Sequence, residues 1–308
     1  MTDHRHVFGP VPSRRLGRSL GVDLVPHKTC TYDCIYCQLG RTACKTLQRK
    51  EWVATDELLA ELKEALQRTE PDWVTLSGSG EPTLHAHLGR IVDRIRAMTT
   101  VPLAVLTNGS LLWMPEVRDA IEAADLVMPT LAAGSDAMFK QVNRPHDELS
   151  LEKVVDGIAQ FRERFKGNLW LEVFLVAGLS ATEAEVPQMI RLAERVHPDR
   201  IQLNTVARPP SESYAFPVPE QQMLRYAARF GRNAAVIADY QGTRDMPEFA
   251  AKRDDVLGLL SHRPCTIEDI AQGLGMHRHE VLKHIEDLMD EAKITTKEQH
   301  GKTYYLRA

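Results

Sequence analysis

The feature that most constrains the fold is a regular alternation of apolar, β-prone runs with amphipathic helical stretches along most of the chain. Such alternation predicts right-handed βαβ units and a parallel sheet. The alternating part, about 210 residues, is short for an eight-stranded barrel, which typically needs about 250. The sequence therefore predicts an α/β fold, a partial (β/α)6 TIM-like barrel, with ligands at the carboxyl ends of its strands. The expected strands are 19–25, 73–77, 103–107, 126–130, 169–176 and 200–206, and the expected helices are 55–68, 88–98, 114–124, 151–165 and 183–196.

Composition excludes several classes of protein. Hydrophobic residues make up 43% and charged residues 26% of the 308 residues, which is typical of a globular chain. No stretch approaches the roughly 18 uninterrupted apolar residues of a membrane helix, and the first residues lack the layout of a secretory signal. We therefore expect a cytoplasmic protein with no membrane partner. The net charge of −4 means that any contact with nucleic acid requires a local basic patch.

Three of the five cysteines, Cys30, Cys34 and Cys37, stand together as C-x3-C-x2-C. In a reducing cytosol such a run indicates a metal or catalytic site rather than disulfides. Structural zinc usually takes two C-x2-C pairs or paired histidines, and Cys44 and Cys265 form no such pair. Three thiolates suit a four-iron cluster that leaves one iron open. A structural zinc or ferredoxin-like site is the alternative, and Cys44 is either an additional thiol of the site or an ordinary cysteine.

With Tyr36 directly before the last cysteine, this segment resembles the signature of the radical S-adenosylmethionine superfamily. The resemblance implies a [4Fe–4S] cluster on the three cysteines and S-adenosylmethionine (SAM) bound at the open iron. It also implies cleavage of SAM to a 5'-deoxyadenosyl radical that abstracts a substrate hydrogen, with a flavodoxin- or ferredoxin-like electron donor as partner. The positions that the resemblance assigns to cofactor binding are Tyr36, Ser79, Gly80, Glu81, Asn108, Thr130, Glu172 and Asn204.

The strand ends carry most of these positions. The segment 77–83 resembles the Gly-Gly-Glu segment of the superfamily, with Ser79 in place of the first glycine, so Gly80 and Glu81 are implied to hold the methionine amino group. Read from the residues alone, the same segment is a strand-to-helix turn. Glu172 lies in an apolar strand, where a carboxylate must be paired or ligand-bound. It contacts the ribose or substrate, or it pairs with an interior arginine.

Basic residues cluster beside these motifs. Guanidinium groups suit carboxylates and phosphates, so the basic residues indicate an anionic substrate. The alternative is that they form ion pairs with acidic residues of neighbouring loops. The candidate substrate residues are Arg14, Arg15, Arg18, Lys28, Arg144 and Arg208.

The block 8–23, together with 77–84, resembles the superfamily branch of tRNA wyosine-type synthases and uncharacterised bacterial relatives, over roughly residues 7–245. The branch implies a nucleotide in RNA, most directly tRNA, as substrate. Wyosine enzymes use a second cluster whose cysteines precede the first, whereas this sequence has no cysteine before Cys30. The alternatives are an activase that installs a glycyl radical in a partner protein and an iron–sulfur, redox-sensing DNA-binding regulator.

After a barrel domain over residues 1–245, residues 254–308 predict three helices and a hairpin, and they resemble a winged helix-turn-helix. Thr266 and Asp269 form a variant of the capping box at the start of one helix. The helix 277–291 would then present Arg278 and Lys283, with three histidines, to a groove. Residues 255–308 nevertheless hold 7 basic and 9 acidic side chains, a net charge of −2, which is unfavourable for general phosphate binding. Nucleic-acid binding and protein docking both stay open for this segment.

Overall fold

A computed structural model of the chain describes residues 6–13, 15–237, 253–274, 276, 278–299 and 301–308. Within them, eight strands form one sheet in the order β1-β2-β5-β6-β7-β8-β9-β10. Every neighbouring pair from β2 to β10 is parallel, and β1 is antiparallel to β2. The bounds are β1 Val7–Ser13, β2 Gly17–Val22, β5 Trp73–Leu76, β6 Leu103–Thr107, β7 Leu126–Leu131, β8 Asn168–Leu175, β9 Arg200–Thr205 and β10 Ala234–Val236. The predicted parallel sheet is confirmed.

The two edge strands, β1 and β10, were not predicted. β1 contains Pro10 and Pro12, and proline is compatible with a strand only at an edge or bulge because it has no N–H to donate. The register of the β1–β2 pair shifts between Phe8 and Val11, around the first of these prolines. β10 has three residues, too few for an alternating pattern to be recognised.

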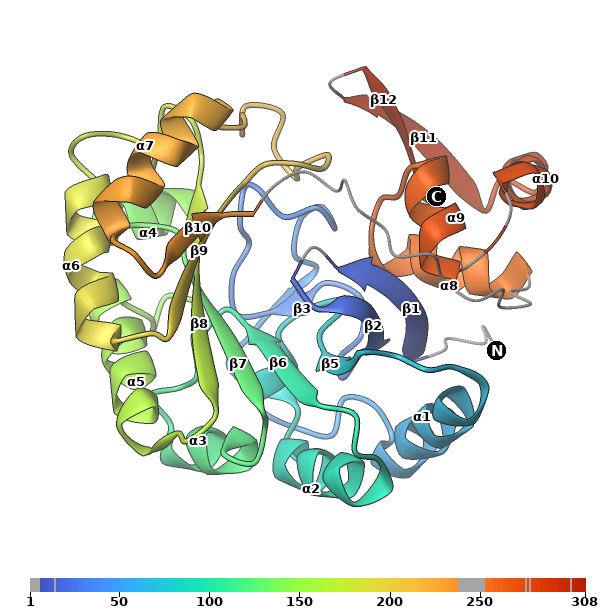
Figure 1. Cartoon of the computed structure of the whole chain (residues 1–308), viewed down its shortest axis with the longest axis horizontal. Coiled ribbons are helices and arrows are strands. Elements are labelled where there is room, and N and C mark those ends of the chain that lie inside the picture. Colours follow the sequence, from blue (N-terminus) through green and yellow to red (C-terminus); the bar gives the residue numbers. More distant parts are fainter. Residues whose placement is uncertain (1–5, 14, 238–252, 275, 277, 300) are drawn as a thin grey trace.

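Helices cover the outer face of the curled sheet (Figure 1). Their bounds are α1 Thr55–Arg68, α2 Leu88–Met98, α3 Pro115–Ile121, α4 Asp136–Val142, α5 Leu151–Arg164, α6 Val186–Val196 and α7 Glu220–Phe230, with a short 3-10 helix η1 Pro82–Leu84. In α1, the apolar stripe that predicted the helix is buried at Leu58, Leu59 and Leu62. The loop after β2 holds the short strand β3 Thr29–Cys30, which pairs with β4 Cys44–Lys45.

The last residues form a separate layer beside β1 (Figure 1). The C-terminal module, residues 253–308, consists of α8 Arg253–His262, α9 Ile267–Leu274, α10 Arg278–Asp290, β11 Ile294–Gln299 and β12 Lys302–Arg307. Its core is shared with the sheet, because Phe8 and Val11 of β1 belong to one apolar cluster with Leu259 and Ile270. The interval 246–253 between the two predicted domains falls almost wholly outside the described residues.

No helix in the part of the chain that the structure describes is both long and apolar enough to cross a bilayer.

Candidate active site

A cavity of about 430 Å³ opens inside the curled sheet and extends to the carboxyl ends of its strands. This volume lies in the range of small-molecule sites. Its walls bring together predicted residues from β-strand ends that are far apart in the sequence. The predicted residues that line it are Arg15, Cys30, Cys34, Tyr36, Cys37, Gly80, Glu81, Asn108, Thr130, Glu172, Asn204 and Arg208.

All three clustered cysteines are free thiols, half-buried, and each has an N–H group close to its sulfur. Such donors stabilise thiolates and tune the potential of clusters bound to them. The contacts are Lys28 Nζ to Cys37 Sγ at 3.2 Å, Asn108 Nδ2 to Cys30 Sγ at 3.5 Å and Asn143 Nδ2 to Cys34 Sγ at 3.4 Å.

The electrostatics of the thiols favour binding to a cationic group. Burial, with the negative charge of Glu81 nearby, raises the pKa of Cys30 to about 12, and burial beside the other thiols raises the pKa of Cys34 further. A bound metal group supplies the positive charge that offsets this burial. The described residues contain no group of three His, Cys, Asp or Glu side chains suited to a single metal ion. A four-iron cluster instead binds each thiolate through a different iron, so this donor set fits a cluster.

Gly80 and Glu81 link the cysteine loop to the strand ends. A Cβ atom on Gly80 would lie 1.8 Å from the carbonyl oxygen of Thr29, so only glycine allows the loop to approach this closely. The same carbonyl accepts a hydrogen bond from the Glu81 backbone N–H at 3.1 Å. The missing side chain of Gly80 therefore allows the cysteine loop to lie against the strand end.

The Glu81 carboxylate is buried and accepts several internal hydrogen bonds. Oε1 accepts from the Thr107 hydroxyl at 2.6 Å and from both the backbone and the hydroxyl of Thr83, and Oε2 accepts from the Asn108 backbone N–H at 2.7 Å. Burial raises the pKa of Glu81, and these hydrogen bonds oppose the increase. The carboxylate thus ties β5 to β6 and orients Asn108 toward the cysteine loop.

Glu172 joins three other predicted residues in one network across the interior of the sheet. Its Oε1 accepts from Arg15 Nη1 and from Asn204 Nδ2, both at 2.9 Å, and its Oε2 accepts from the Thr130 hydroxyl at 2.9 Å. Of the two readings of Glu172, the structure contains the pairing with an interior arginine. The neutralised network presents hydroxyl and amide groups to the cavity.

Tyr36 and Lys28 flank the cysteine loop. The Tyr36 ring stacks on Phe174 with 4.0 Å between centroids, and its hydroxyl receives a hydrogen bond from Asn143. Lys28 is buried, and its backbone adopts a left-handed φ of 59°. It does not line the cavity itself, but its ammonium group approaches Cys37 from the side.

Several of the predicted site residues do not line this cavity. Arg18 pairs with Pro12 in the β1–β2 ladder and donates its backbone N–H to Asp72, which precedes β5, so it lies at the amino ends of the parallel strands, opposite the cysteines. Ser79 faces away from the cavity, donating its N–H to Asp23 and placing its hydroxyl 3.4 Å from His262 Nδ1. Arg14 lies outside the described residues, as does His277.

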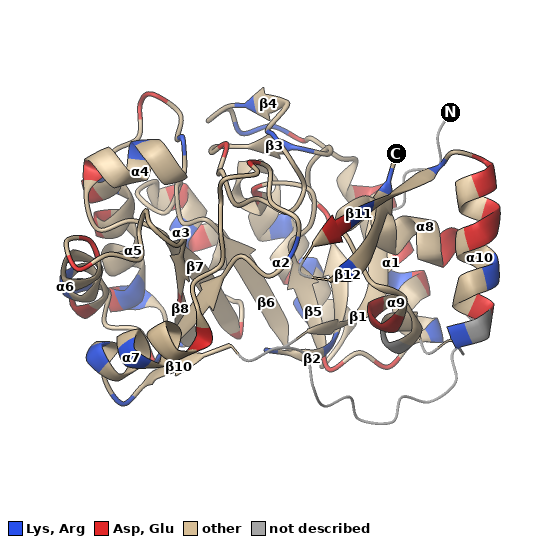
Figure 2. Cartoon of the chain, turned by 90° about the horizontal axis from the view of Figure 1, so that it is seen from above, with Lys and Arg blue, Asp and Glu red and all other residues tan. Residues whose placement is uncertain are grey.

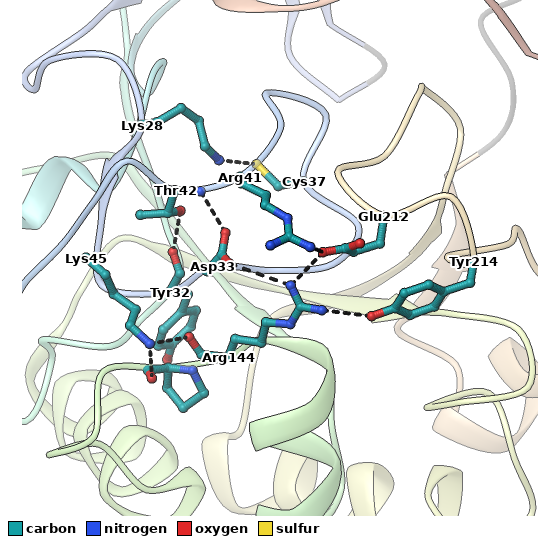
Figure 3. Close-up of polar contacts among 11 residues, drawn as sticks. Lys28, Tyr32, Asp33, Cys37, Arg41, Thr42, Lys45, Arg144, Glu212 and Tyr214 are labelled. Carbon is teal, nitrogen blue, oxygen red and sulfur yellow. Dashed lines mark hydrogen bonds and ion pairs between the residues drawn. The ribbon is translucent and has the colours of Figure 1, made fainter.

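Arg144 is occupied by acidic and phenolic partners on the outer side of the cysteine loop (Figure 3). Its guanidinium contacts Glu212 at 2.7 Å and Asp33 at 3.6 Å, and it donates to the Tyr214 hydroxyl at 2.8 Å. Glu212 also pairs with Arg41 at 2.8 Å. The hydrogen bond to Glu212 raises the pKa of Arg144. Arg144 thus forms the ion pairs that are the alternative to a substrate contact.

Arg208 reaches from the sheet to the C-terminal module. Its Nη1 donates to the carbonyl of Pro264 and lies 3.5 Å from the Asp269 carboxylate. Arg208 therefore lines the cavity and also binds the C-terminal module to the barrel.

Sequence reasoning missed two residues of the C-terminal module, His262 and Arg263, that line the cavity. His262 stacks on Phe8 at 3.9 Å and contacts Asp23 at 3.2 Å. Both residues come from the end of α8, far in sequence from every cofactor motif. No sequence pattern indicates them, because they reach the site only through packing of the module on β1.

The sequence relates this chain to several curated proteins. The family model described as "Radical SAM superfamily" matches residues 24–193. A UPF0026 protein from Methanocaldococcus jannaschii is 32% identical over 97% of this chain and 95% of its own length, and one from Helicobacter pylori is 31% identical over 97% and 96%. A Brachyspira hyodysenteriae protein named GTPase Obg is 36% identical over 98% of this chain, which spans 45% of that protein.

Solved structures share the fold. A radical SAM methyltransferase from Sphaerobacter thermophilus has a TM-score of 0.54 at 15% identity, over 71% of this chain and 66% of that one. Streptococcus suis SuiB, bound to the precursor peptide SuiA, has a TM-score of 0.52 at 10% identity, over 68% and 45%. With the family match and three free cysteines lining a cavity at the strand ends, these findings show that the chain belongs to the radical SAM superfamily, whose cofactors are a [4Fe–4S] cluster and S-adenosylmethionine.

Proposed function

We propose that this chain is a radical SAM enzyme in which Cys30, Cys34 and Cys37 hold a [4Fe–4S] cluster and the 430 Å³ cavity holds S-adenosylmethionine. Held by these thiolates, the cluster would supply the one-electron reductive cleavage of SAM that is the source of 5'-deoxyadenosyl radical chemistry and hydrogen abstraction from a substrate. A flavodoxin- or ferredoxin-like protein supplies the electron, and the protein works in the cytoplasm. The observation that carries the proposal is the convergence of the three thiols and the strand-end polar groups on one cavity.

The chain's own residues would divide the work of holding the cofactors. The backbone at Gly80 and Glu81, with Asn108, borders the cysteines and is suited to the amino-acid part of SAM. The Thr130, Glu172 and Asn204 network is suited to hydroxyl groups such as those of a ribose. Tyr36, directly before the last cysteine, stacks on Phe174 in the cavity wall and would help to shield a bound cluster from water.

We propose a nucleotide in RNA, most directly tRNA, as the substrate, bound between the barrel domain 1–245 and a winged-helix domain 254–308. The order of three helices and an antiparallel hairpin supports a winged helix. The exposed charged residues described on α10 are Arg278, Glu280, Lys283, Glu286, Asp287 and Asp290, so acidic side chains outnumber basic ones on this helix and weaken its attraction for phosphates (Figure 2). Contact with RNA would therefore use the side of the module that faces the barrel.

The test is anaerobic turnover. Reconstituted protein is mixed with dithionite and SAM, with and without cellular tRNA, and 5'-deoxyadenosine and nucleoside masses are measured. We expect 5'-deoxyadenosine without RNA, and stimulation or a shifted nucleoside mass with it. Cleavage that RNA leaves unchanged would contradict an RNA substrate and favour activation of a partner protein. An intact cluster without cleavage would contradict the enzyme proposal and favour a redox-sensing regulator.

Replacement of one proposed ligand checks the cluster assignment. Cys34→Ala removes one of three thiolates, so we expect iron content and SAM cleavage to fall together to background. The matched control is Cys44→Ala, which removes a half-buried thiol outside the cavity lining. SAM cleavage by the Cys34→Ala variant, or equal loss of iron in both variants, would contradict the assignment.

A further inference from the structure

A second cavity of about 740 Å³ lies between the cysteine loop, the barrel and the C-terminal module. Gln38, His262 and Arg263 line both cavities, so the second one adjoins the first. Of the predicted cofactor residues that the structure describes, only Ser79 lines this second cavity, which borders the proposed reaction centre.

Arg263 stands where the two cavities meet, with part of its guanidinium unsatisfied. Its Nε and Nη2 atoms are buried, and neither has a hydrogen-bond partner among the described residues. Two buried donor nitrogens on a cation are costly unless a ligand accepts hydrogen bonds from them. Burial lowers the pKa of Arg263, which reflects the same cost of an uncompensated buried charge. An anion bound at the junction of the two cavities would offset this buried charge and accept the free hydrogen bonds.

The surroundings of Arg263 leave an excess of positive charge. The nearby carboxylate of Asp269 already pairs with Arg208. The other Asp, Glu, Lys or Arg side chains in the lining of the second cavity are Lys297, Arg307 and Asp23, and Asp23 is engaged by Ser79 and His262. Lys297 and Arg307 donate to a carbonyl and a hydroxyl, and neither forms an ion pair with another described residue. Several separated cations match the charge of a phosphate ester better than that of one carboxylate.

We propose that Arg263 binds a phosphate group of the substrate at the junction of the two cavities, with Lys297 and Arg307 at the rim. This inference rests on the proposed function, because a substrate held at the junction would lie beside the cavity in which the radical is proposed to form. The C-terminal module then contributes directly to substrate binding through the end of α8. A nucleotide and a phosphodiester of RNA share this chemistry.

The inference can be tested without turnover, on the full-length reconstituted protein. Trp52 lines the second cavity, so its fluorescence reports a bound ligand there. Titrations use inorganic pyrophosphate, adenosine monophosphate and a short single-stranded RNA, with acetate as the carboxylate control. We expect saturable binding of the phosphate probes and weak binding of acetate. The Trp52→Phe variant should lose the fluorescence response, but it should still bind the phosphate probes when binding is measured by calorimetry. Tighter, strongly salt-dependent binding of RNA than of the mononucleotide would identify RNA as the source.

Arg263→Gln is expected to raise the Kd of pyrophosphate about tenfold or more, because a charge-assisted contact is lost. The matched control is Arg94→Gln, the same change at an exposed position of α2. Arg263→Lys keeps the charge but not the forked donors, and an intermediate Kd is expected. Melting temperatures without ligand verify that each variant is folded.

Unchanged pyrophosphate affinity in Arg263→Gln, equal losses in both glutamine variants, or no phosphate binding by the unaltered protein would overturn the inference. These outcomes are separable from those of the proposed function. Arg263-dependent phosphate binding without SAM cleavage would contradict only the enzyme proposal, whereas SAM cleavage without phosphate binding would contradict only the role of Arg263.

Discussion

At the scale of single residues, the site depends on close contacts that a larger side chain would disrupt. Gly80 is the clearest example, because its missing side chain lets the cysteine loop press against the end of β5. The backbone N–H of Lys28 also donates to the Ser79 carbonyl at 2.7 Å, so the loop and the strand end are joined on both sides of the glycine. Movement at this point would displace Cys30 relative to Asn108.

We therefore predict that the substitution Gly80→Ala displaces the cysteine loop locally. We expect reduced iron content after reconstitution and a lower free energy of unfolding, by about 2 kcal/mol, because backbone must shift to admit the methyl group. The control Gly258→Ala places the same methyl group on α8, where no atom lies within 4 Å of it. There, stability should rise by about 0.5–1 kcal/mol. Full iron incorporation in Gly80→Ala would show that the close approach is dispensable.

At the scale of elements, the start of α9 connects the module to the barrel. The predicted capping box is confirmed, because the Thr266 N–H donates to Asp269 at 3.0 Å and the Asp269 N–H donates to the Thr266 hydroxyl at 3.1 Å. Only the structure shows that Asp269 also pairs with Arg208 of the barrel. Burial acts to raise the pKa of Asp269, but Arg208 and the Thr266 N–H outweigh it, so the pKa is lowered from its ordinary 3.8.

The lowered pKa of Asp269 predicts that the stability of the folded chain depends on pH. Ionised Asp269 stabilises the folded chain at pH values above 3.8, and this contribution is lost as the pH falls through the lowered pKa. Asp269→Asn should cost about 3 kcal/mol at neutral pH, because Arg208 loses its buried partner, and it should flatten the decline in stability below pH 4. Urea unfolding between pH 6 and 3 measures both effects. The control is Asp56→Asn on the exposed face of α1, and the same acid sensitivity in Asp269→Asn as in the parent chain would contradict the assignment.

At the scale of the whole molecule, the module and the barrel share one apolar cluster across β1. Phe8 is 9% exposed and Val11 7% exposed, and both are covered by the module. β1 is also the edge of the sheet, so removal of the module would expose an unpaired edge together with apolar side chains. The module is thus part of the structure of the barrel as well as a wall of its cavities.

Deletion of residues 250–308 should accordingly destabilise the barrel rather than leave it unaltered. Loss of cover over Phe8 and Val11 corresponds to roughly 3 kcal/mol, or a melting temperature lower by about 5–10 °C. Circular dichroism melts and binding of a hydrophobic dye report the change. A truncated chain that melts with the full-length protein would show that the shared cluster contributes nothing to barrel stability. The substitution Arg263→Gln consequently tests substrate binding more cleanly than truncation does.

Local patterns were enough to predict the inner strands β2 and β5 to β9 and the helices α1, α2, α3, α5 and α6, since each buried strand and amphipathic helix records its own burial in its sequence. The helices α4 and α7 were not predicted. The cysteine spacing indicated a metal or catalytic site, because disulfides are rare in a reducing compartment, and the resemblance of this segment to the radical SAM signature then predicted the chemistry. Glu172 was singled out as a carboxylate in an otherwise apolar strand, whereas Thr130 and Asn204 were assigned from the resemblance to the superfamily. The edge strand β1 escaped detection because its prolines contradict the ordinary strand pattern.

What the sequence by itself determined is therefore the parallel sheet, the cluster motif and the strand ends at which polar groups gather. Only the tertiary structure decided which charges meet: Glu172 with Arg15, Arg144 with Glu212, and Arg208 with Asp269. It alone placed Arg263 beside the cavity, where two of its nitrogens have no hydrogen-bond partner within the described part of the chain. The physical reason is that periodicity reports whether a residue is buried, whereas the partner of a buried charge comes from a distant segment and depends on how the elements pack.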